Sequence, residues 1–435
     1  MNVNRALVIW VGICVAASSG AAWGQAAAPR ELTLDQALAL ARQGNRSLVA
    51  ERARLVQAHT TVDRAWTVLF PTVAAQGKYT RNNVQFQFAR SATSALTIQP
   101  LDQLDGAVNV SVPLIVPAAY PGLRAVNMTE RAVQENVHAT ENAVLFGVAQ
   151  TFYAAAIADE VLVARQSSIE VSRATLANAT TRFENGSVTK VDVDRAQLAL
   201  LRAEQSEREA KLVREQTYRS LGTLIGLEDP FRVSRATPTS ADGPTPPPRT
   251  GDLASTLQLR PEFRALEATA EAEQAERRSH AWRWAPSLSG FGNARVFNYD
   301  NFAGKSHSWA VGAQLDWVLY DGGVRDTQRR MAAAQAVEAA ARADVLRDTI
   351  RDDLANGRRQ LETKGQAQQT FERAVDLARE TVDLVRIQYE AGHSTQVDLL
   401  AAQDNLVAAQ EALAQAHFDV AVADLTLRRA AGSFP

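Results

Sequence analysis

The sequence predicts a mainly helical protein with a smaller β component, built from two structurally equivalent halves. Three features support this: a segment that occurs twice, Ala-rich stretches with heptad spacing that are far longer than ordinary globular helices, and short segments in which apolar and polar residues alternate. The repeated segments are residues 182–204 and 388–410, which align at a constant offset of 206 positions. Two copies of one structural unit are therefore expected.

Residues 1–24 have the pattern of a secretory signal peptide. One positive charge, Arg5, precedes an apolar run over residues 6–17, and small residues precede the expected cleavage before Gln25. Cys14 is the only cysteine, and it lies in this run. A lipid-anchored Cys14 is the alternative, but the residues before it are a poor match to the small residues that such a site needs. We expect a mature chain without thiols or disulfides.

Charge and motifs point away from nucleic-acid binding and from catalysis. The formal net charge of −2 becomes −3 once Arg5 is removed, which gives no basic footprint for nucleic acid. No phosphate-binding loop, nucleophile elbow or H-E-x-x-H zinc motif occurs. The six histidines, including His393, show no ligand spacing. We expect no enzyme activity, no catalytic residues, no cofactor and no metal site.

Long amphipathic helices dominate the predicted structure. At about 1.5 Å per residue, the two longest would each span about 100 Å. Apolar residues from Leu399 to Leu427 follow steps of three and four, and their large/small alternation suits antiparallel coiled-coil packing. The equivalent seam of the first copy includes Glu207 and Arg214, so the halves are not interchangeable. The predicted helical stretches are 33–69, 120–185, 188–225, 253–284, 322–390 and 394–430.

Each half also contains a predicted β-hairpin. Residues 308–319 alternate strictly, with Trp309, Val311, Leu315 and Trp317 on one face, and residues 108–114 alternate in the same way. Less regular strands precede them. These are expected at about 72–90 and 287–300, with hairpin tips at 91–104 and 300–306.

The two tryptophans suggest a strand that crosses a membrane. Trp309 and Trp317 are eight residues apart, or ~26 Å at strand rise, close to the ~25 Å apolar band with aromatic girdles of an outer-membrane strand. A soluble sandwich with two core tryptophans is the alternative. No apolar run after the signal peptide approaches the ~20 residues of a membrane-spanning helix, so any membrane crossing must use strands. Four strands cannot close a barrel, whereas three copies would supply twelve.

A Pro-rich stretch divides the two halves. Residues 238–248 read PTSADGPTPPP, which is typical of a surface linker. We therefore expect a first repeat over 25–237, a linker over 238–250 and a second repeat over 251–435.

The motifs together resemble the TolC-like outer membrane efflux proteins. They are Arg182–Gly186 leading to Val191-Asp192, Tyr389–Gly392 leading to Val397-Asp398, and Leu319–Gly323 after the last strand. The resemblance implies a homotrimer in the outer membrane with a periplasmic extension. Each protomer would give four strands to a twelve-stranded barrel and coiled-coil helices to a periplasmic α-barrel. It also implies docking of a periplasmic adaptor (membrane fusion) protein that is coupled to an inner-membrane pump.

The repeated motif is expected at two helical tips. Gly186 and Gly392 supply the positive φ of the reversing turn. Thr189 and Thr395 are candidate N-caps, with Asp192 and Asp398 at the capping-box position. In the family these tips form the periplasmic aperture and the adaptor-docking surface, which here would also include Val191 and Val397. At the other end of the molecule, the outer-membrane lipid would meet Trp309 and Trp317.

The resemblance also implies a gate at the tips. Three copies of Asp398 would ring the pore axis and favour cations, although a simple capping role is the alternative. The family usually has a second aspartate three residues later, where this chain has Ala401. In the family a tyrosine equivalent to Tyr389 bonds an aspartate equivalent to Asp192, and an arginine stands where this chain has Ser394. We expect a closed state weaker than the family norm.

The sequence thus predicts a passive export conduit gated at its helical tips. An outer membrane channel for type I protein secretion stays open as an alternative within the same class. A periplasmic coiled-coil scaffold with a soluble sandwich is the alternative from another class.

Overall fold

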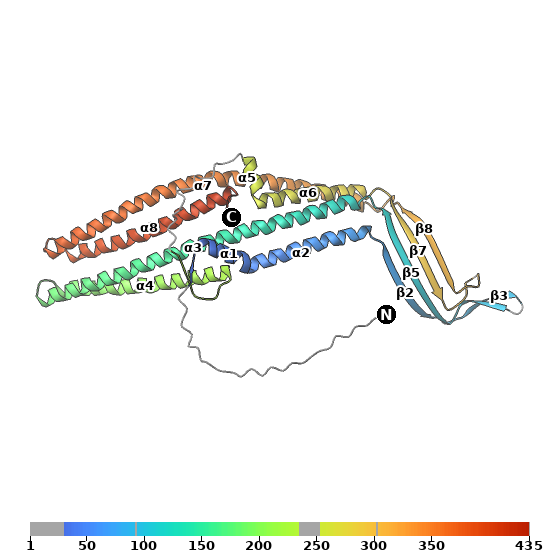
Figure 1. The fold of residues 1–435 in the computed structure, drawn as a ribbon, viewed down its shortest axis with the longest axis horizontal. Helices are drawn as coiled ribbons and strands as arrows, with labels where there is room; N and C mark the ends of the chain where they lie inside the picture. Colours follow the sequence, from blue (N-terminus) through green and yellow to red (C-terminus); the bar gives the residue numbers. More distant parts are fainter. Residues whose placement is uncertain (1–29, 92–93, 235–252, 302, 435) are drawn as a thin grey trace, which may run out of the picture.

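The computed structural model describes residues 30–91, 94–234, 253–301 and 303–434. The predicted signal peptide, with Cys14, and the predicted linker 238–250 lie outside these residues. The described chain is strongly elongated, with a β-sheet at one end and two helical tips at the other (Figure 1).

The two halves have the same order of main elements: a helix pair, two long strands, a long helix and a return helix. The first half comprises β1 (Arg30–Leu32), α1 (Leu34–Gly44), α2 (Arg46–Trp66), a 3₁₀ turn (Thr67–Leu69), β2 (Thr72–Arg81), β3 (Phe86–Ser91), β4 (Ser94–Gln99), β5 (Asp102–Ile115), α3 (Ala119–Glu184), α4 (Lys190–Ile225) and β6 (Phe231–Val233). The second half comprises α5 (Leu253–Leu259), α6 (Pro261–Trp282), β7 (Ser287–Phe297), β8 (His307–Asp316), α7 (Val324–Glu390) and α8 (Gln396–Ala430).

Two predicted helices are each broken in two. The stretch 33–69 is interrupted at Asn45, whose side-chain oxygen accepts from the backbone amides of Ser47 and Leu48 and so caps α2. The stretch 253–284 is interrupted before Pro261, which begins α6 because proline suits the first turn of a helix. The prediction of single helices was wrong at both points, since local capping chemistry overrides a continuous apolar pattern.

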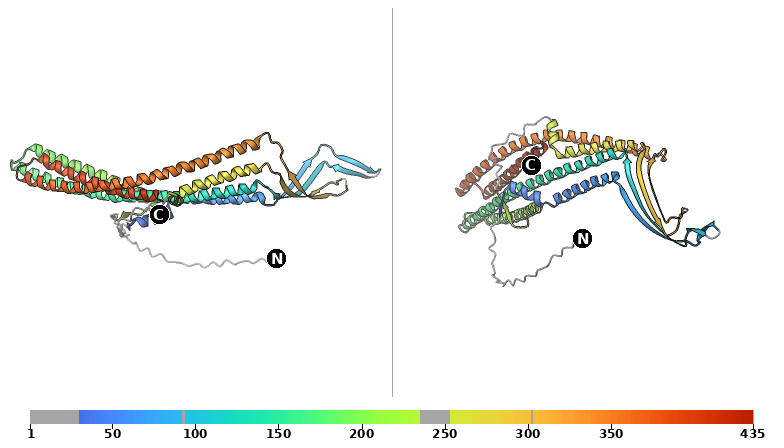
Figure 2. Two further views of the ribbon diagram at one scale, coloured as in Figure 1. Left: turned by 90° about the horizontal axis from the view of Figure 1, so that it is seen from above. Right: turned by 45° about the vertical axis from the view of Figure 1, so that its right-hand side comes forward.

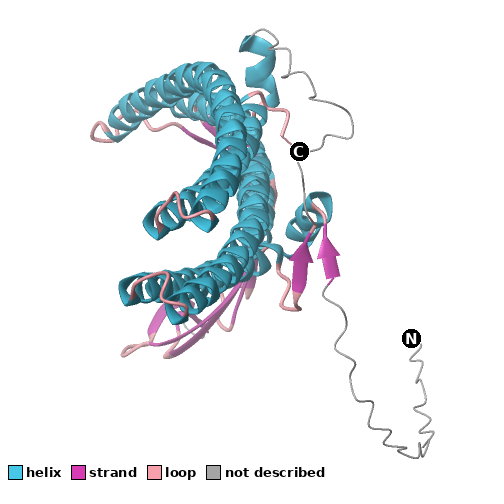
Figure 3. Cartoon of the chain, turned by 90° about the vertical axis from the view of Figure 1, so that its left-hand side faces the viewer, coloured by secondary structure: helices cyan, strands magenta, loops and turns pink. Residues whose placement is uncertain are grey.

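The long helices form one curved layer. Near the sheet, α2, α3, α6 and α7 lie side by side, and near the tips α3 pairs with α4 and α7 with α8 (Figures 1 and 2). Seen from the tips, the layer is an arc, and the short parallel ribbon of β1 and β6 lies on its convex side (Figure 3). Two buried apolar clusters lie at mid-height, and the larger contains Phe152, Leu145 and Leu221.

The four long strands form one antiparallel sheet in the order β2-β5-β7-β8, with β2 and β8 as its edges. The register sorts the side chains into two faces. Residues directly opposite each other on antiparallel strands share a face. The apolar face carries Val73, Ala75, Tyr79, Leu104, Val108, Val110, Val112, Leu288, Ala294, Val296, Trp309, Val311, Ala313 and Leu315, with Arg81, Asp102 and His307 at its end away from the helices. The other face carries Gln76, Lys78, Thr80, Gln103, Asp105, Asn109, Ser111, Asn293, Arg295, Ser308, Gln314 and Asp316, with Phe291 and Phe297 among them.

The strand ends differ from the prediction. The first strand ends at Arg81 rather than near residue 90, and much of the predicted tip 91–104 belongs to a separate hairpin of β3 and β4. Strand β8 ends at Asp316, so Trp317 lies one residue beyond it, where its Nε1 donates to the Trp284 carbonyl at 3.2 Å. Only Trp309 of the predicted pair is therefore a strand residue. The sheet-to-helix exits differ as predicted: Gly322 and Gly323 have positive φ before α7, whereas Ala118, the residue before α3, has a φ of −70°.

Among the residues that the structure describes, one helix is apolar enough to cross a membrane by length and composition alone. An 18-residue window of α3 has a mean hydropathy of 1.3, so the expectation that no helix would qualify was wrong. Helix α3 packs against α2, α4, α6 and α8, and a helix with neighbours on several sides carries apolar residues on several sides. Only 33% of the window is buried within the protomer, so packing inside one chain accounts for part of its apolar composition.

Candidate functional site

Both helical tips turn by the same hydrogen-bond pattern, as the repeat predicts. At the first tip Gly186 has a φ of 71°, and the Ser187 amide donates to the Arg182 carbonyl at 2.8 Å. At the second tip Gly392 has a φ of 80°, and the His393 amide donates to the Gln388 carbonyl at 2.8 Å. A side chain at either glycine would meet nothing within 4 Å, so the backbone angle alone explains the residue.

The predicted N-caps are present at both tips, with the capping-box arrangement at each. The hydroxyl and amide of Thr395 donate to Asp398 Oδ2 at 2.6 and 3.0 Å, and the Asp398 amide returns a bond to the hydroxyl at 3.3 Å. Thr189 makes the same two bonds to Asp192, at 2.8 and 3.0 Å, but the Asp192 amide donates to the Thr189 carbonyl at 3.1 Å. The returning bond to the threonine hydroxyl is therefore better formed at the second tip.

These caps fix the charge of both aspartates. The Thr189 bonds hold the pKa of Asp192 below its usual value. The Thr395 bonds do the same for the pKa of Asp398, helped by Ser394, whose hydroxyl donates to Asp398 at 3.2 Å. Both carboxylates thus carry negative charge near neutral pH. Within one protomer, Ser394 supports the cap rather than reaching the other hairpin.

The predicted link between Tyr389 and Asp192 is not made within the protomer. Tyr389 is only 6% exposed, and the Arg182 guanidinium lies 4.6 Å from the centre of its ring. Arg182 Nη1 also donates to the Tyr389 carbonyl at 3.1 Å. Arg182 was part of the motif that carried the resemblance, but its type and position alone did not indicate this role. The contact joins the first repeat to the second at the tip.

Apolar side chains are exposed at equivalent positions just beyond the caps. Val191 and Val397 are about half exposed on the first turns of α4 and α8. Val397 also lines an open groove of about 650 Å³ between α4 and α8, which has α3 as its floor. Arg195 and Arg202 lie along the α4 side of this groove, and Asp404 and Glu411 along the α8 side. The tip region therefore presents an elongated groove with apolar and charged walls.

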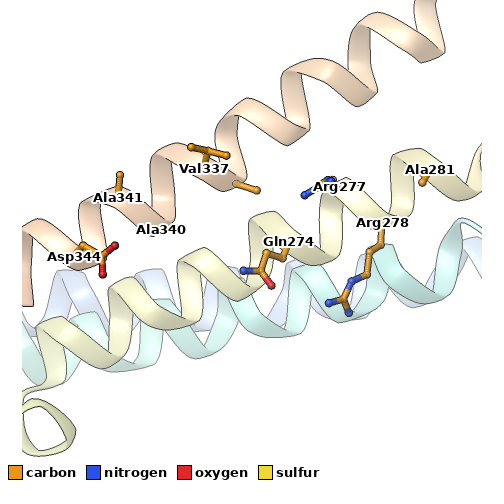
Figure 4. Close-up of a pocket in the computed structure, with 9 residues that line it drawn as sticks. Gln274, Arg277, Arg278, Ala281, Val337, Ala340, Ala341 and Asp344 are labelled. Carbon is orange, nitrogen blue, oxygen red and sulfur yellow. The ribbon is translucent and has the colours of Figure 1, made fainter. Parts of the chain in front are cut away.

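A second groove, of about 660 Å³, lies between α6 and α7, where the two helices diverge (Figure 4). Gln274, Arg277 and Arg278 come from α6, and Val337 and Asp344 come from α7. These side chains form no nucleophile–base pair. Among the residues that the structure describes, no group of three His, Cys, Asp or Glu side chains could hold a metal ion.

The membrane-girdle candidates lie at the other end of the molecule. Trp309 is 76% exposed on the apolar face of the sheet, beside Val311, which is 77% exposed. Trp317 is also exposed, at the junction of sheet and helices. An apolar face this exposed on a single protomer indicates a surface that is covered by lipid or by another molecule.

Comparison with known sequences places these features in context. A family model described as outer membrane efflux protein matches residues 37–227 and 253–433. The chain is 24% identical to the outer membrane efflux protein BepC of Brucella suis over 308 residues, which cover 69% of this chain and 66% of BepC, just under two thirds. It is 25% identical to the toluene efflux pump outer membrane protein TtgC of Pseudomonas putida over 382 residues, which cover 84% of this chain and 75% of TtgC.

Solved structures share the fold. The chain superimposes on CusC with a TM-score of 0.81 and 15% identity, covering 92% of this chain and 91% of CusC. It superimposes on the outer membrane protein VceC of Vibrio cholerae with a TM-score of 0.76 and 18% identity, covering 92% of this chain and 96% of VceC.

Proposed function

The chain belongs to the outer membrane efflux protein family, and on that premise we propose that three copies form the passive exit duct of a tripartite efflux system. The duct crosses the outer membrane as a β-barrel, extends into the periplasm as a helical barrel and is gated at its helical tips. The protein itself performs no chemistry. Energy comes from an inner-membrane pump, which a periplasmic adaptor protein connects to the duct.

The single observation that carries this proposal is the two-faced sheet. One face is apolar along most of all four strands, with Arg81, Asp102 and His307 only at the end away from the helices, and the other is lined by amides, hydroxyls and charges. A soluble sandwich would cover the apolar face with a second layer, whereas Trp309 and Val311 are uncovered. Lipid outside and water inside is the environment that suits both faces.

Closure of this sheet requires other copies. Strands β2 and β8 are edges, and unpaired edge groups are not tolerated in lipid. Since neighbouring strands alternate in direction through the sheet, β8 of one copy can pair with β2 of the next without breaking the antiparallel pattern. Three copies give a twelve-stranded barrel. The helical layer is curved, as expected for the part of a closed helical barrel that one protomer would form (Figure 3).

The tips are the proposed docking and gating end. The groove between α4 and α8, together with Val191 and Val397, offers apolar and charged contacts to a helical partner such as an adaptor hairpin. Asp398, and with it Asp192, would place ionised carboxylates at the aperture and favour cations there. Ala401 leaves the Asp398 ring without a second acidic layer.

Small molecules are the proposed cargo. TtgC is a toluene efflux pump protein, and a further relative in Pseudomonas putida, 24% identical to this chain, is the antibiotic efflux pump outer membrane protein ArpC. These names support small-molecule efflux over protein secretion.

Two adjacent substitutions test whether the apolar face of the sheet meets lipid. Val311→Arg places a charge on the apolar face in the middle of β8, and Ala310→Arg places the same charge on the polar face. An arginine on the lipid side costs about 2–4 kcal/mol near the bilayer midplane, whereas a lumen position tolerates it. We expect Val311→Arg to reduce the amount of trimer recovered from the outer membrane severalfold, while Ala310→Arg stays near wild type.

Two other results would contradict the proposal. Equal recovery of the two variants would show that the apolar face does not meet lipid. Recovery of the wild-type chain as a soluble periplasmic protein would favour the coiled-coil scaffold.

A further inference from the structure

The two hairpins of one protomer meet along a polar seam between α3 and α8. Arg165 of α3 pairs with Glu411 of α8 at 2.5 Å. Nearer the tip, Gln403 Nε2 donates to Thr175 Oγ1 at 3.3 Å. Seven residues are about two turns of a helix. Two more turns toward the tip on each antiparallel helix therefore lead from Thr175 to Arg182 and from Gln403 to Gln396.

At the tip end of this seam, Arg182 turns away to α7. Its guanidinium lies over the buried ring of Tyr389 and donates to the Tyr389 carbonyl, one of the last carbonyls of α7. A cation at a helix C-terminus is favourable, and a stacked arginine gains further from the ring. The first hairpin thereby holds the end of the second. The repeat does not supply a mirrored contact, because the equivalent residues are Gln388 and Phe183.

Gln396 is the α8 residue that this spacing places opposite Arg182, and its side-chain amide makes no hydrogen bond to any described residue. Its side chain is only 3% exposed, and within the described residues neither its amide nitrogen nor its amide oxygen has a partner. The equivalent residue of the first repeat, Lys190, is exposed. A buried amide without partners loses its bonds to water and gains nothing in return. Parting the hairpins at the tip would return Gln396 to water.

We propose that Arg182 is a positioning residue of the gate, which fastens the two hairpins of each protomer at the tip, and that Gln396 opposes it by favouring their separation. This inference rests on the proposed function, since it assigns the regulation of the tip of a channel. Hairpins packed side by side occupy a smaller circumference than parted ones. The fastened arrangement is therefore the narrower one, and the balance of the two residues sets how readily the aperture widens.

Opposite substitutions test the two roles. Arg182→Gln installs the residue found at the equivalent position of the second repeat, and it removes both contacts with Tyr389. Gln396→Leu keeps similar volume and removes the unsatisfied amide. The matched control is Arg173→Gln, because Arg173 lies on the same helix but pairs with Glu204 inside its own hairpin at 3.6 Å. The full-length trimers are reconstituted in planar lipid bilayers, and the open and closed dwell times of single channels are recorded.

We expect Arg182→Gln to raise the ratio of open to closed dwell time roughly tenfold, from the usual strength of a charge-assisted bond and a cation–π contact. Arg182→Lys should fall between Arg182→Gln and wild type, because lysine keeps the charge but loses the planar stack. Gln396→Leu should lower the ratio, and Arg173→Gln should leave it unchanged. A structural role alone would change the thermal stability of Arg182→Gln and Gln396→Leu without opposite shifts in gating.

The outcomes separate the inference from the function on which it rests. If the wild-type trimer forms no pores, the proposed channel function fails. If it forms pores but Arg182→Gln gates like wild type or like Arg173→Gln, or if Gln396→Leu opens the channel, the assignment of the two residues is wrong while the channel stands. Should Arg182→Gln yield no trimer, Arg182→Lys and Gln396→Leu still decide the question.

Discussion

The two helical hairpins are cross-linked at nearly the same height, but with opposite charge polarity. In the first hairpin the acid is on the outgoing helix: Asp159 of α3 pairs with Arg214 of α4 and accepts a 2.5 Å bond from the Tyr218 hydroxyl. In the second the base is on the outgoing helix, and Lys364 of α7 pairs with Asp419 of α8 at 2.6 Å. Shifted by the repeat offset of 206, the residues of the first link fall one position beyond Lys364 and Asp419. A cross-link at this height is thus common to both hairpins, while its chemistry is not.

The packing around the hairpins differs more strongly. The first repeat contributes most of a large mid-height cluster, into which Phe152 is fully buried. The second repeat has a smaller cluster around Phe263 and Ile350. At the offset of 206, Arg358 occupies the place of Phe152 and Ala431 that of Ile225. The first repeat is therefore expected to be the more stable scaffold and the second the more easily displaced partner.

Matched truncations of the two phenylalanines should give the largest effect. Phe152→Ala should cost about 3–5 kcal/mol, because a fully enclosed site cannot collapse around the cavity. Phe263→Ala should cost less, since its cluster is smaller and Arg347, 5.8 Å from its ring, can move in. Thermal unfolding of the trimer in detergent, followed by circular dichroism, measures both. Equal losses would refute the ranking of the two repeats.

The polar cross-links should give an intermediate effect. Asp159→Asn removes the charge that Arg214 and Tyr218 share, and we expect a loss of about 1–3 kcal/mol. Lys364→Met, in the more exposed link of the second hairpin, should cost less than about 1 kcal/mol. The same unfolding measurement compares them. A larger loss for Lys364→Met would mean that the second hairpin depends more on its cross-link than the exposure of that link indicates.

The first cross-link should also make the protein sensitive to alkali. Burial, together with the bond to Asp159, raises the pKa of Tyr218 to about 12, above the usual value near 10. The Tyr218 hydroxyl loses its proton near pH 10 in the unfolded chain but only near pH 12 in the folded protein. Its contribution to the free energy of unfolding is therefore fully present below pH 10 and is lost as the pH rises toward and through 12. The unfolding temperature measured from pH 8 to 12 should fall less steeply in Tyr218→Phe than in wild type. Identical slopes would exclude Tyr218 as the titrating group.

Features that depend on local residue types could be predicted from the sequence, whereas contacts between the two repeats could not. The long helices, both tip turns and both caps were predictable, because each depends on local residue types: heptad spacing, Gly392 at a left-handed position, Thr395 ahead of Asp398. The breaks at Asn45 and Pro261 were missed where capping interrupts a continuous apolar pattern. The Arg182–Tyr389 contact and the burial of Gln396 depend on which helix lies beside which. A single sequence does not encode that directly, so the residues of the two tips could be located but not paired.

The caps at the two tips should give the smallest effect and the finest comparison. The Thr395 hydroxyl both accepts from the Asp398 amide and donates to its carboxylate, whereas the Thr189 hydroxyl bonds Asp192 chiefly by donating to the carboxylate. Thr395→Ala should therefore destabilise the first turn of α8 by about 1 kcal/mol, and Thr189→Ala should destabilise the first turn of α4 by less. Amide hydrogen exchange of the two tips, read by mass spectrometry, isolates these local changes. Thr395→Ser, which keeps the hydroxyl, should exchange like wild type. Equal exchange in the two alanine variants would mean that the reciprocal bond at the second tip adds nothing, and that the tips differ only through the contacts that Arg182 makes with one of them.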